Sequence, residues 1–183
     1  EEAMKFTGVI EHADHVDDIF HEAFRQAFTG KPGPVYVEYP QDFAAATHSF
    51  GPLKQIPEYR LAHQRADHDS LAAAATLLEQ AEQPVLLVGN GVFASRAQEV
   101  MHKQATGVQG PVIPTPGASA RVLDGLDISA PYATAAANEA RARADVVLAV
   151  GTEIGEPIHY GTGRHWSAGC SDRKWIYIER DTS

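Results

Sequence analysis

Pro84-Val-Leu-Leu-Val-Gly-Asn-Gly-Val-Phe-Ala-Ser95 is the stretch that decides the fold. Its first five residues form an apolar run that is long enough for a buried strand and too short for a helix. Gly89 and Gly91 break this run, and Ser95 is a suitable N-cap for the helical pattern that follows. A strand, a glycine turn and a helix in this order are typical of a parallel α/β unit. Such a turn is expected to leave backbone N–H groups free beside a helix N-terminus.

The same alternation of helix and strand continues on both sides of this stretch. Periodicity and propensity predict three helices, Ser70–Ala81 with Asp69 as its cap, Ser95–Ala105 and Ala135–Ala144. Further short apolar runs predict strands at Gly110–Thr115, Val146–Val150 and Trp175–Ile178. Between them, Gly117–Tyr132 is predicted to be a loop with one helical turn near Arg121. The pattern predicts an α/β fold: a three-layer, doubly wound, mostly parallel sheet with its strand ends on one edge.

A partial α/β unit precedes this domain. Apolar residues recur at three- and four-residue spacing from Asp14 to Phe28, which predicts an amphipathic helix capped by Asp14 and stopped by Gly30. A Pro-Gly turn and a strand, Val35–Tyr39, follow. We expect this strand to have nothing to pair with unless more sheet lies upstream, although Phe6–Ile10 already resembles the middle of a folded element.

The domain organisation follows from these patterns. Residues 41–68 show no period and contain two prolines, so they are interpreted as an extended linker over a surface. We predict a C-terminal remnant of one domain at 1–45, a linker at 46–68 and a Rossmann-like domain at 69–183. Because the chain opens on Glu1 rather than on methionine, we expect it to be a fragment.

Composition narrows the functional classes. The chain has 183 residues, 44% of them hydrophobic, and no apolar run approaches the ~20 residues of a membrane span. Its formal net charge of -9 argues against a nucleic-acid groove or an anionic membrane surface as a partner. A single cysteine, Cys170, cannot form an internal disulfide, so a cytoplasmic location is expected.

The glycine turn is the first candidate binding site. Gly89-Asn90-Gly91-Val-Phe-Ala94 fits the relaxed dinucleotide pattern G-x-G-x-x-[GA] in its strand-to-helix context. The acidic residue that usually holds a ribose hydroxyl about 20 residues later is absent, because Ile113–Thr115 occupies that place. The turn is therefore either a packing turn between strand and helix or part of a nucleotide or flavin site.

Polar groups at the other strand ends are expected to converge on the same crevice. These candidates are Thr115, the turn Gly151-Thr152-Glu153-Ile154, and the acids Glu179 and Asp181. Carboxylates there can accept hydrogen bonds from a ribose or an adenine amine, but they repel a pyrophosphate unless a base such as Arg96, Arg121 or Arg164 lies near. The alternative is that the acids after the third strand are solvated loop residues.

Metal and nucleophile chemistry is not indicated. The nine histidines lack zinc-site spacing and there is no H-E-x-x-H; His159 and His165 lie in a glycine-rich loop. Cys170 has no C-x-x-C partner, and no serine stands in a G-x-S-x-G context, which excludes the α/β-hydrolases. We predict neither a catalytic residue nor a metal ligand in this chain.

Five blocks of the chain resemble the thiamine-diphosphate enzymes of the acetolactate synthase group. Phe28-Thr-Gly-Lys-Pro-Gly-Pro-Val-Tyr-Val-Glu-Tyr-Pro-Gln-Asp42 is similar to the end of that family's pyrimidine-binding domain. The central-domain blocks follow in the family's order and at about its spacing: Gln83–Gly91, Pro111–Thr115, Ala144–Thr152 and Trp175–Asp181. The resemblance therefore covers nearly the whole chain and combines the end of the first domain with the central domain.

The resemblance implies a larger parent enzyme that binds thiamine diphosphate and Mg²⁺ between two other domains and acts on 2-oxoacids. The family's activating glutamate and its G-D-G segment are both absent here, so this fragment is expected to bind neither cofactor. Central domains of relatives bind FAD, an adenosine nucleotide or nothing. Glu153 stands where FAD-binding members often carry a base, and Pro116–Ala120 replaces the usual lysine-glycine loop, which both weaken the case for FAD.

Three functions remain open at this point. The first is a fragment of a 2-oxoacid decarboxylase or carboligase that carries a scaffold domain, whose partners are the parent's other domains and a homodimer or homotetramer. The second is a self-contained adenine-nucleotide-binding module with its ligand in the Gly89 crevice. The third is a pure assembly domain.

Overall fold

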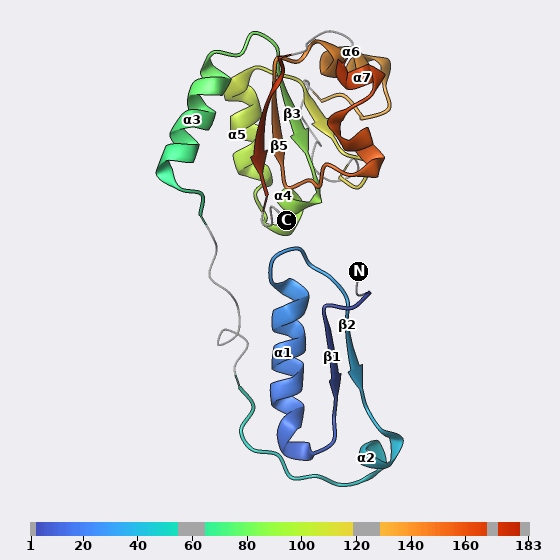
Figure 1. The fold of residues 1–183 in the computed structure, drawn as a ribbon. Helices are drawn as coiled ribbons and strands as arrows, with labels where there is room; N and C mark the ends of the chain where they lie inside the picture. The colour runs from blue at the N-terminus through green and yellow to red at the C-terminus, as the bar shows by residue number, and fades with distance from the viewer. Residues whose placement is uncertain (1–2, 55–64, 119–128, 168–171, 180–183) are drawn as a thin grey trace. The chain divides into compact units, whose positions relative to one another are not determined.

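The computed structural model describes residues 3–54, 65–118, 129–167 and 172–179 (Figure 1). Asp181, Arg121 and Cys170 lie outside these residues, as does the helical turn predicted near Arg121. The chain divides into two compact units, residues 1–65 and residues 66–182, and each is described by itself.

The second unit contains a four-stranded sheet in which every pair of neighbours is parallel, as predicted. Its strands are β3 (Pro84–Val88), β4 (Val112–Pro114), β5 (Val146–Val150) and β6 (Lys174–Ile178), in the spatial order β4-β3-β5-β6. Leu86 is level with Val112 on one side and with Leu148 on the other. The chain leaves β3 toward β4 and later crosses back to β5, so the winding reverses between β3 and β5.

Helices cover both faces of this sheet, which gives the predicted three layers (Figure 1). On one face, Leu86, Val88 and Leu148 pack with residues of α3 (His68–Glu79) and α5 (Gln98–Val108). On the other face, Val85, Leu87, Val147 and Ala149 pack with residues of α6 (Ala135–Arg143) and α7 (Arg164–Ser167). Burial on both faces explains why these strands are apolar throughout instead of alternating.

Two helix caps of the second unit differ from the sequence prediction. Asp67, not Asp69, caps α3, because its carboxylate accepts from the Ser70 N–H at 2.8 Å. Ser95 caps no helix N-terminus: its hydroxyl donates to the Gly91 carbonyl at 2.8 Å, at the end of the five-residue helix α4 (Asn90–Ala94). Arg96 then has a positive φ of 56°, which separates α4 from α5. The helix predicted at Ser95–Ala105 is present as α5, but it begins at Gln98, and the short helix α4 before it was not predicted.

The first unit is a parallel strand–helix–strand motif. It consists of β1 (Phe6–Val9), a 3₁₀ turn at Ala13–His15, α1 (Val16–Phe28), β2 (Val35–Glu38) and α2 (Gln41–Ala45). Strand β1 pairs with β2, with Phe6 level with Val35, so the expectation that the later strand lacks a partner in this chain is wrong. His15 and not Asp14 is the N-cap residue of α1. The stretch 41–68 was predicted to be extended, but its first five residues form α2, which ends just before the predicted linker at 46–68.

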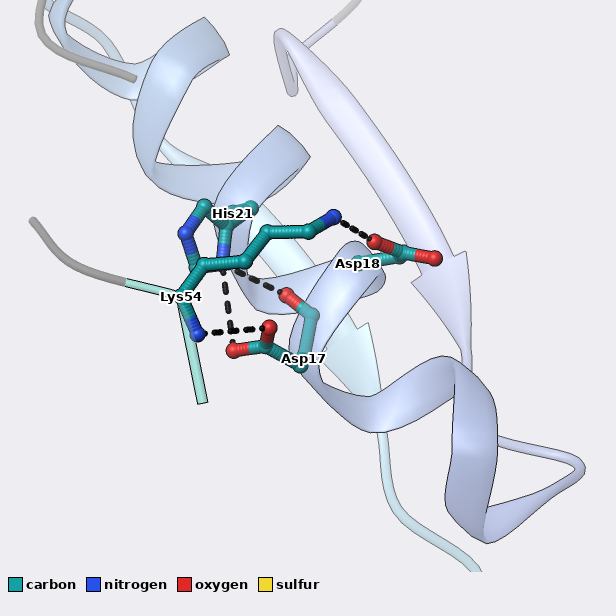
Figure 2. A network of polar contacts seen from close by, with 4 residues as sticks. All are labelled: Asp17, Asp18, His21 and Lys54. Carbon is teal, nitrogen blue, oxygen red and sulfur yellow. Dashed lines mark hydrogen bonds and ion pairs between the residues drawn. The ribbon is translucent and has the colours of Figure 1, made fainter. Parts of the chain in front are cut away.

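A polar network ties the segment around Lys54 to the start of α1 (Figure 2). The Lys54 backbone N–H donates to the Asp17 carboxylate at 3.2 Å, and the Lys54 ammonium forms an ion pair with Asp18. One turn along the helix, His21 Nδ1 lies 2.9 Å from the Asp17 carbonyl oxygen. These contacts hold the extended segment that ends at Lys54 against the surface of α1, while residues 51–54 stay exposed.

Within the described residues, no helix combines the length and the apolar character that crossing a membrane requires.

Candidate functional site

Most of the candidate residues lie together on one edge of the second unit's sheet. Because all four strands are parallel, their carboxyl ends share that edge. Thr115 follows β4, Gly89 follows β3, Gly151 follows β5 and Glu179 follows β6. We call this edge, with the turns 89–91 and 151–154, the carboxyl rim. The structure describes all of the predicted site residues there except Asp181.

The two glycine turns of the carboxyl rim are in direct backbone contact. A Cβ atom on Gly89 would lie 2.2 Å from the Gly151 carbonyl oxygen, and one on Gly91 would lie 2.6 Å from the Gly151 Cα. Gly151 has a positive φ of 58°, and its own Cβ would lie 2.6 Å from the Val92 nitrogen. Glycine is thus required at all three positions because the turns pack against each other without room for a side chain.

The two turns are joined by a hydrogen bond from a backbone N–H group that was expected from the sequence to be free. The Gly91 N–H donates to the Gly151 carbonyl at 2.8 Å, and the Gly89 N–H donates to the Val150 carbonyl at 2.9 Å. Helix α4, which starts at Asn90, has only five residues. The prediction of free N–H groups at this turn is therefore wrong for Gly89 and Gly91, and the geometry favours the packing interpretation of the motif.

The remaining candidates divide into buried and exposed groups. Thr115 and Thr152 are buried, and the Thr115 N–H donates to the Val88 carbonyl at 2.9 Å, which continues the β3–β4 ladder. Asn90 and Glu153 are exposed, and Ile154 is half-buried. Any ligand that contacts the turns through side chains would therefore meet the amide of Asn90 and the carboxylate of Glu153, a neutral and an acidic group.

Sequence reasoning missed a hollow beside the segment that follows the carboxyl rim. It has a volume of about 560 Å³ and is lined by Glu156, His159, Tyr160, Thr162, Gly163 and His165. His159 and Tyr160 both have positive φ, at 54° and 52°, although neither is glycine. The residue before them is held in place, because the indole N–H of the buried Trp166 donates to the Ile158 carbonyl at 3.2 Å. Only the nearby glycines hint at this conformation in the sequence.

The second unit also contains a buried arginine, Arg141 on α6, which is 2% exposed. Its guanidinium carbon lies 3.8 Å from the centre of the Tyr132 ring, and its nitrogens donate to the carbonyls of Ala137 and Tyr132 at 3.2 and 3.0 Å. Burial lowers the pKa of Arg141, and the interaction with Tyr132 partly opposes this. The arginine binds helix α6 to the segment before it, which is a structural task.

The arrangement offers no metal centre among the described residues. In residues 3–54, 65–118, 129–167 and 172–179, no group of three or more His, Cys, Asp or Glu side chains is placed to hold a metal ion. This also holds for Glu156, His159 and His165, which line the hollow.

Comparison with known proteins places these features in a family context. Residues 71–183 match the family model "Thiamine pyrophosphate enzyme, central domain". The chain is 30% identical over 185 residues to an acetolactate synthase of Mycobacterium leprae, covering 97% of the chain and 28% of that protein. It is 26% identical over 177 residues to human 2-hydroxyacyl-CoA lyase 1, covering 96% of the chain and 29% of that protein.

A solved structure has the same fold. It is the thiamine diphosphate-dependent 4-hydroxybenzoylformate decarboxylase of Rhodococcus jostii RHA1, with a TM-score of 0.73 and 24% identity, covering 98% of this chain and 34% of that one. The chain spans only 26% to 29% of the length of curated relatives such as these synthases and lyases.

Proposed function

The chain belongs to the thiamine pyrophosphate enzymes through its central domain, and from this premise we propose that it is the scaffold portion of a larger enzyme. The parent would be a thiamine-diphosphate-dependent 2-oxoacid decarboxylase or carboligase that resembles acetolactate synthase. The chain would contribute the end of the pyrimidine-binding domain (1–45), a linker (46–68) and the central domain (69–183). It would act in the cytoplasm, beside the parent's other domains and within a homodimer or homotetramer.

The contact between the two glycine turns carries this proposal. At the reversal point of a parallel sheet, a ligand-binding domain keeps backbone N–H groups available for a phosphate. Here the Gly91 N–H donates to the Gly151 carbonyl, and the other turn leaves no room for a Cβ atom on Gly89 or Gly91. This geometry supports a role in holding the sheet together.

The described residues do not fit thiamine diphosphate or its metal. No three described acidic, histidine or cysteine side chains are grouped to bind Mg²⁺. The glutamate and the G-D-G segment that the family uses for the cofactor are absent from this sequence. We therefore assign no catalytic step to this chain and propose that thiamine diphosphate and Mg²⁺ bind to the parent's other domains.

The proposal is tested on the full-length parent with and without added thiamine diphosphate and Mg²⁺. We expect cofactor-dependent release of carbon dioxide from at least one of a panel of 2-oxoacids, for example pyruvate and benzoylformate. We expect none from the 183-residue chain under the same conditions. Because one relative is a 2-hydroxyacyl-CoA lyase by name, the panel includes 2-hydroxyacyl-CoA; cleavage of that substrate alone would overturn the 2-oxoacid assignment.

A second candidate function is binding of an adenine nucleotide or FAD at the carboxyl rim. It is favoured by the exposed Asn90 and Glu153, which lie beside the reversal point between β3 and β5. In this alternative, Thr115, Thr152, Ile154, Glu179 and Asp181 would complete the pocket around the three glycines. Titration calorimetry of the chain with ADP and with FAD separates the two functions: saturable binding that Glu153→Gln changes supports the nucleotide site, and no heat at high protein concentration supports the scaffold.

A further inference from the structure

The glycine turn after β3 places an asparagine directly before a glycine, at Asn90-Gly91. Asparagine in this position is prone to deamidation, because glycine has no side chain to shield its backbone nitrogen. The Gly91 nitrogen forms a bond to the side-chain amide carbon of Asn90, and the C–N bond of that amide breaks. Ammonia leaves with the Gly91 proton as a five-membered succinimide ring closes. Water then opens this ring to aspartate or to isoaspartate, so the reaction needs no reactant other than water.

The side-chain amide of Asn90 is accessible in the folded chain. Asn90 is exposed, and its Nδ2 atom lies 3.5 Å from a Cβ built on Gly117, which itself has no side chain. Water can therefore reach the amide, and ammonia can leave. The protein's other asparagine, Asn138, precedes Glu139, whose side chain shields the following backbone nitrogen. Asn90 is thus the more reactive of the two asparagines by sequence.

The attacking nitrogen, by contrast, is held in place by the second glycine turn. The Gly91 N–H donates to the Gly151 carbonyl at 2.8 Å, so this nitrogen keeps its proton. A Cβ on Gly91 would lie 2.6 Å from the Gly151 Cα, which leaves the turn little room to move. Asn90 is also the first residue of α4, and ring closure requires its ψ to leave the helical value near −42°. The two reacting groups are therefore kept apart as long as the turns stay in contact.

We propose that Asn90-Gly91 is a deamidation site that the contact between the two glycine turns protects. When the turns separate, the Gly91 nitrogen is released and the ring can form. Isoaspartate carries its backbone through the side-chain carbons, which inserts one extra atom between the Asn90 Cα and the Gly91 nitrogen. The Gly91 N–H is then displaced from the Gly151 carbonyl, so opening permits the modification and the modification prevents closing. This inference concerns the chain's own turns and requires neither a parent enzyme nor a ligand.

Ageing of the 183-residue chain tests whether the fold protects Asn90. The chain is incubated at mildly alkaline pH, either folded in buffer or unfolded in concentrated urea. The tryptic peptide 66–96 contains Asn90 as its only asparagine, so its mass and its isoaspartate content report on this site. We expect Asn90 to deamidate at least tenfold more slowly in the folded chain, while Asn138 reacts slowly in both. Equal rates at Asn90 in the folded and the unfolded chain would overturn the inference.

Two variants separate opening of the turns from unfolding of the whole second unit. In Gly89→Ala the new Cβ would lie 2.2 Å from the Gly151 carbonyl oxygen, so the turns must part. Asp145→Asn weakens the same unit at the opposite edge of the sheet, just before β5, and leaves the turns in contact. Urea is added until both variants have the same unfolded fraction by tryptophan fluorescence. We expect Asn90 to deamidate at least fivefold faster in Gly89→Ala than in Asp145→Asn, and equal rates would contradict the role assigned to the contact.

If Gly89→Ala does not fold, hydrogen exchange in the wild type answers the same question. Exchange of the Gly91 N–H reports how often its bond to the Gly151 carbonyl breaks. In urea concentrations below the unfolding midpoint, deamidation of Asn90 should rise in proportion to this exchange. A deamidation rate that stays constant while the Gly91 N–H exchanges faster would overturn the inference.

Refolding of the modified chains tests the consequence of the reaction. Chains aged in urea are returned to buffer, and those with isoaspartate at position 90 are separated from unmodified ones. We expect unmodified chains to recover the wild-type urea midpoint and isoaspartate chains to unfold at a lower one. An unchanged midpoint would show that the modification does not prevent closing. The carbon dioxide assay on the parent is independent of these results, so their failure leaves the proposed activity standing.

Discussion

The two units of this chain are built from the same strand–helix–strand motif but bury it to different extents. In the second unit, β3 and β5 are buried over most of their length and helices cover both faces of the sheet. In the first unit, β1 and β2 are exposed at every second residue, and three phenylalanines of α1 face outward. The same local pattern therefore yields a closed core in one unit and an open surface in the other.

The difference also extends to the contacts that join segments. Backbone groups take part in the contacts that join segments of the second unit. The Gly91 N–H donates to the Gly151 carbonyl, and the Asp145 carboxylate accepts from three main-chain N–H groups. In the first unit, the segment at Lys54 is joined to α1 by side chains on the surface. Water competes poorly with buried contacts and strongly with exposed ones, so the three changes below are expected to have decreasing effects.

Gly89→Ala is expected to have the largest effect. Its new Cβ would lie 2.2 Å from the Gly151 carbonyl oxygen and 2.4 Å from the Thr152 Cβ, so the two turns must separate. We expect the free energy of unfolding of the second unit to fall by about 3 kcal/mol. Urea unfolding followed by tryptophan fluorescence measures it, since Trp166 and Trp175 are the protein's two tryptophans and both lie in this unit.

Gly107→Ala is the matched control for this substitution. Gly107 lies inside α5, and no atom outside its own helix lies within 4 Å of a Cβ built on it. Because alanine favours the helix, the same assay should show a gain of about 0.5 kcal/mol. If Gly107→Ala lowered the free energy of unfolding as much as Gly89→Ala, the loss at Gly89 could not be attributed to the contact between the two turns.

Asp145→Asn is expected to have an intermediate effect that depends on pH. Burial raises the pKa of the Asp145 carboxyl, but hydrogen bonds from the N–H groups of Glu82, Gln83 and Val146 lower it, and the net pKa lies below its usual value. At pH 7, loss of this carboxylate should cost about 1–3 kcal/mol of the second unit's stability.

The sign of the pH dependence follows from the lowered pKa of Asp145. A group with a depressed pKa in the folded state stabilises the protein above its unfolded pKa of about 4, and this contribution is lost as the pH falls through the folded value. The difference between the wild type and Asp145→Asn in urea unfolding should therefore shrink below about pH 4. A difference that is constant from pH 7 to pH 3 would show that the charge of this carboxyl does not matter.

Lys54→Met is expected to have the smallest effect and to remain within the first unit. It removes the exposed ion pair with Asp18 but keeps the Lys54 backbone N–H, which donates to Asp17 (Figure 2). We expect faster amide exchange at residues 51–54 and no change in tryptophan-detected unfolding. As a control, Lys103→Met replaces an exposed lysine of α5 and should change neither measurement. High salt should bring the wild type close to the variant, because it screens exposed charges. If neither the substitution nor salt changes the amide exchange rate at residues 51–54, the ion pair does not hold this segment on α1.

The errors of sequence interpretation have separate local causes, and the first is that a polar side chain can satisfy either end of a helix. Ser95 was a plausible N-cap, but its hydroxyl bonds the last carbonyls of α4, and the positive φ of Arg96 ends that turn. Asp67 and Asp69 are both suitable caps for α3, and only the backbone path selects Asp67. The pairing of β1 was missed because four residues that include Gly8 carry little periodicity of their own.

The sequence by itself determined the local structure of the second unit and its family. Short apolar runs, glycines at their ends and helical spacing between them are enough to specify buried parallel strands, and β3 and β5 have the predicted bounds. Tertiary structure alone decided how the strand ends are used. Gly89 and Gly151 are 62 residues apart in sequence, and only the parallel pairing of β3 with β5 brings their turns into contact and uses the Gly91 N–H. Hydrogen bonds between distant segments depend on which strands become neighbours, and that choice depends on burying both faces of the whole sheet at once.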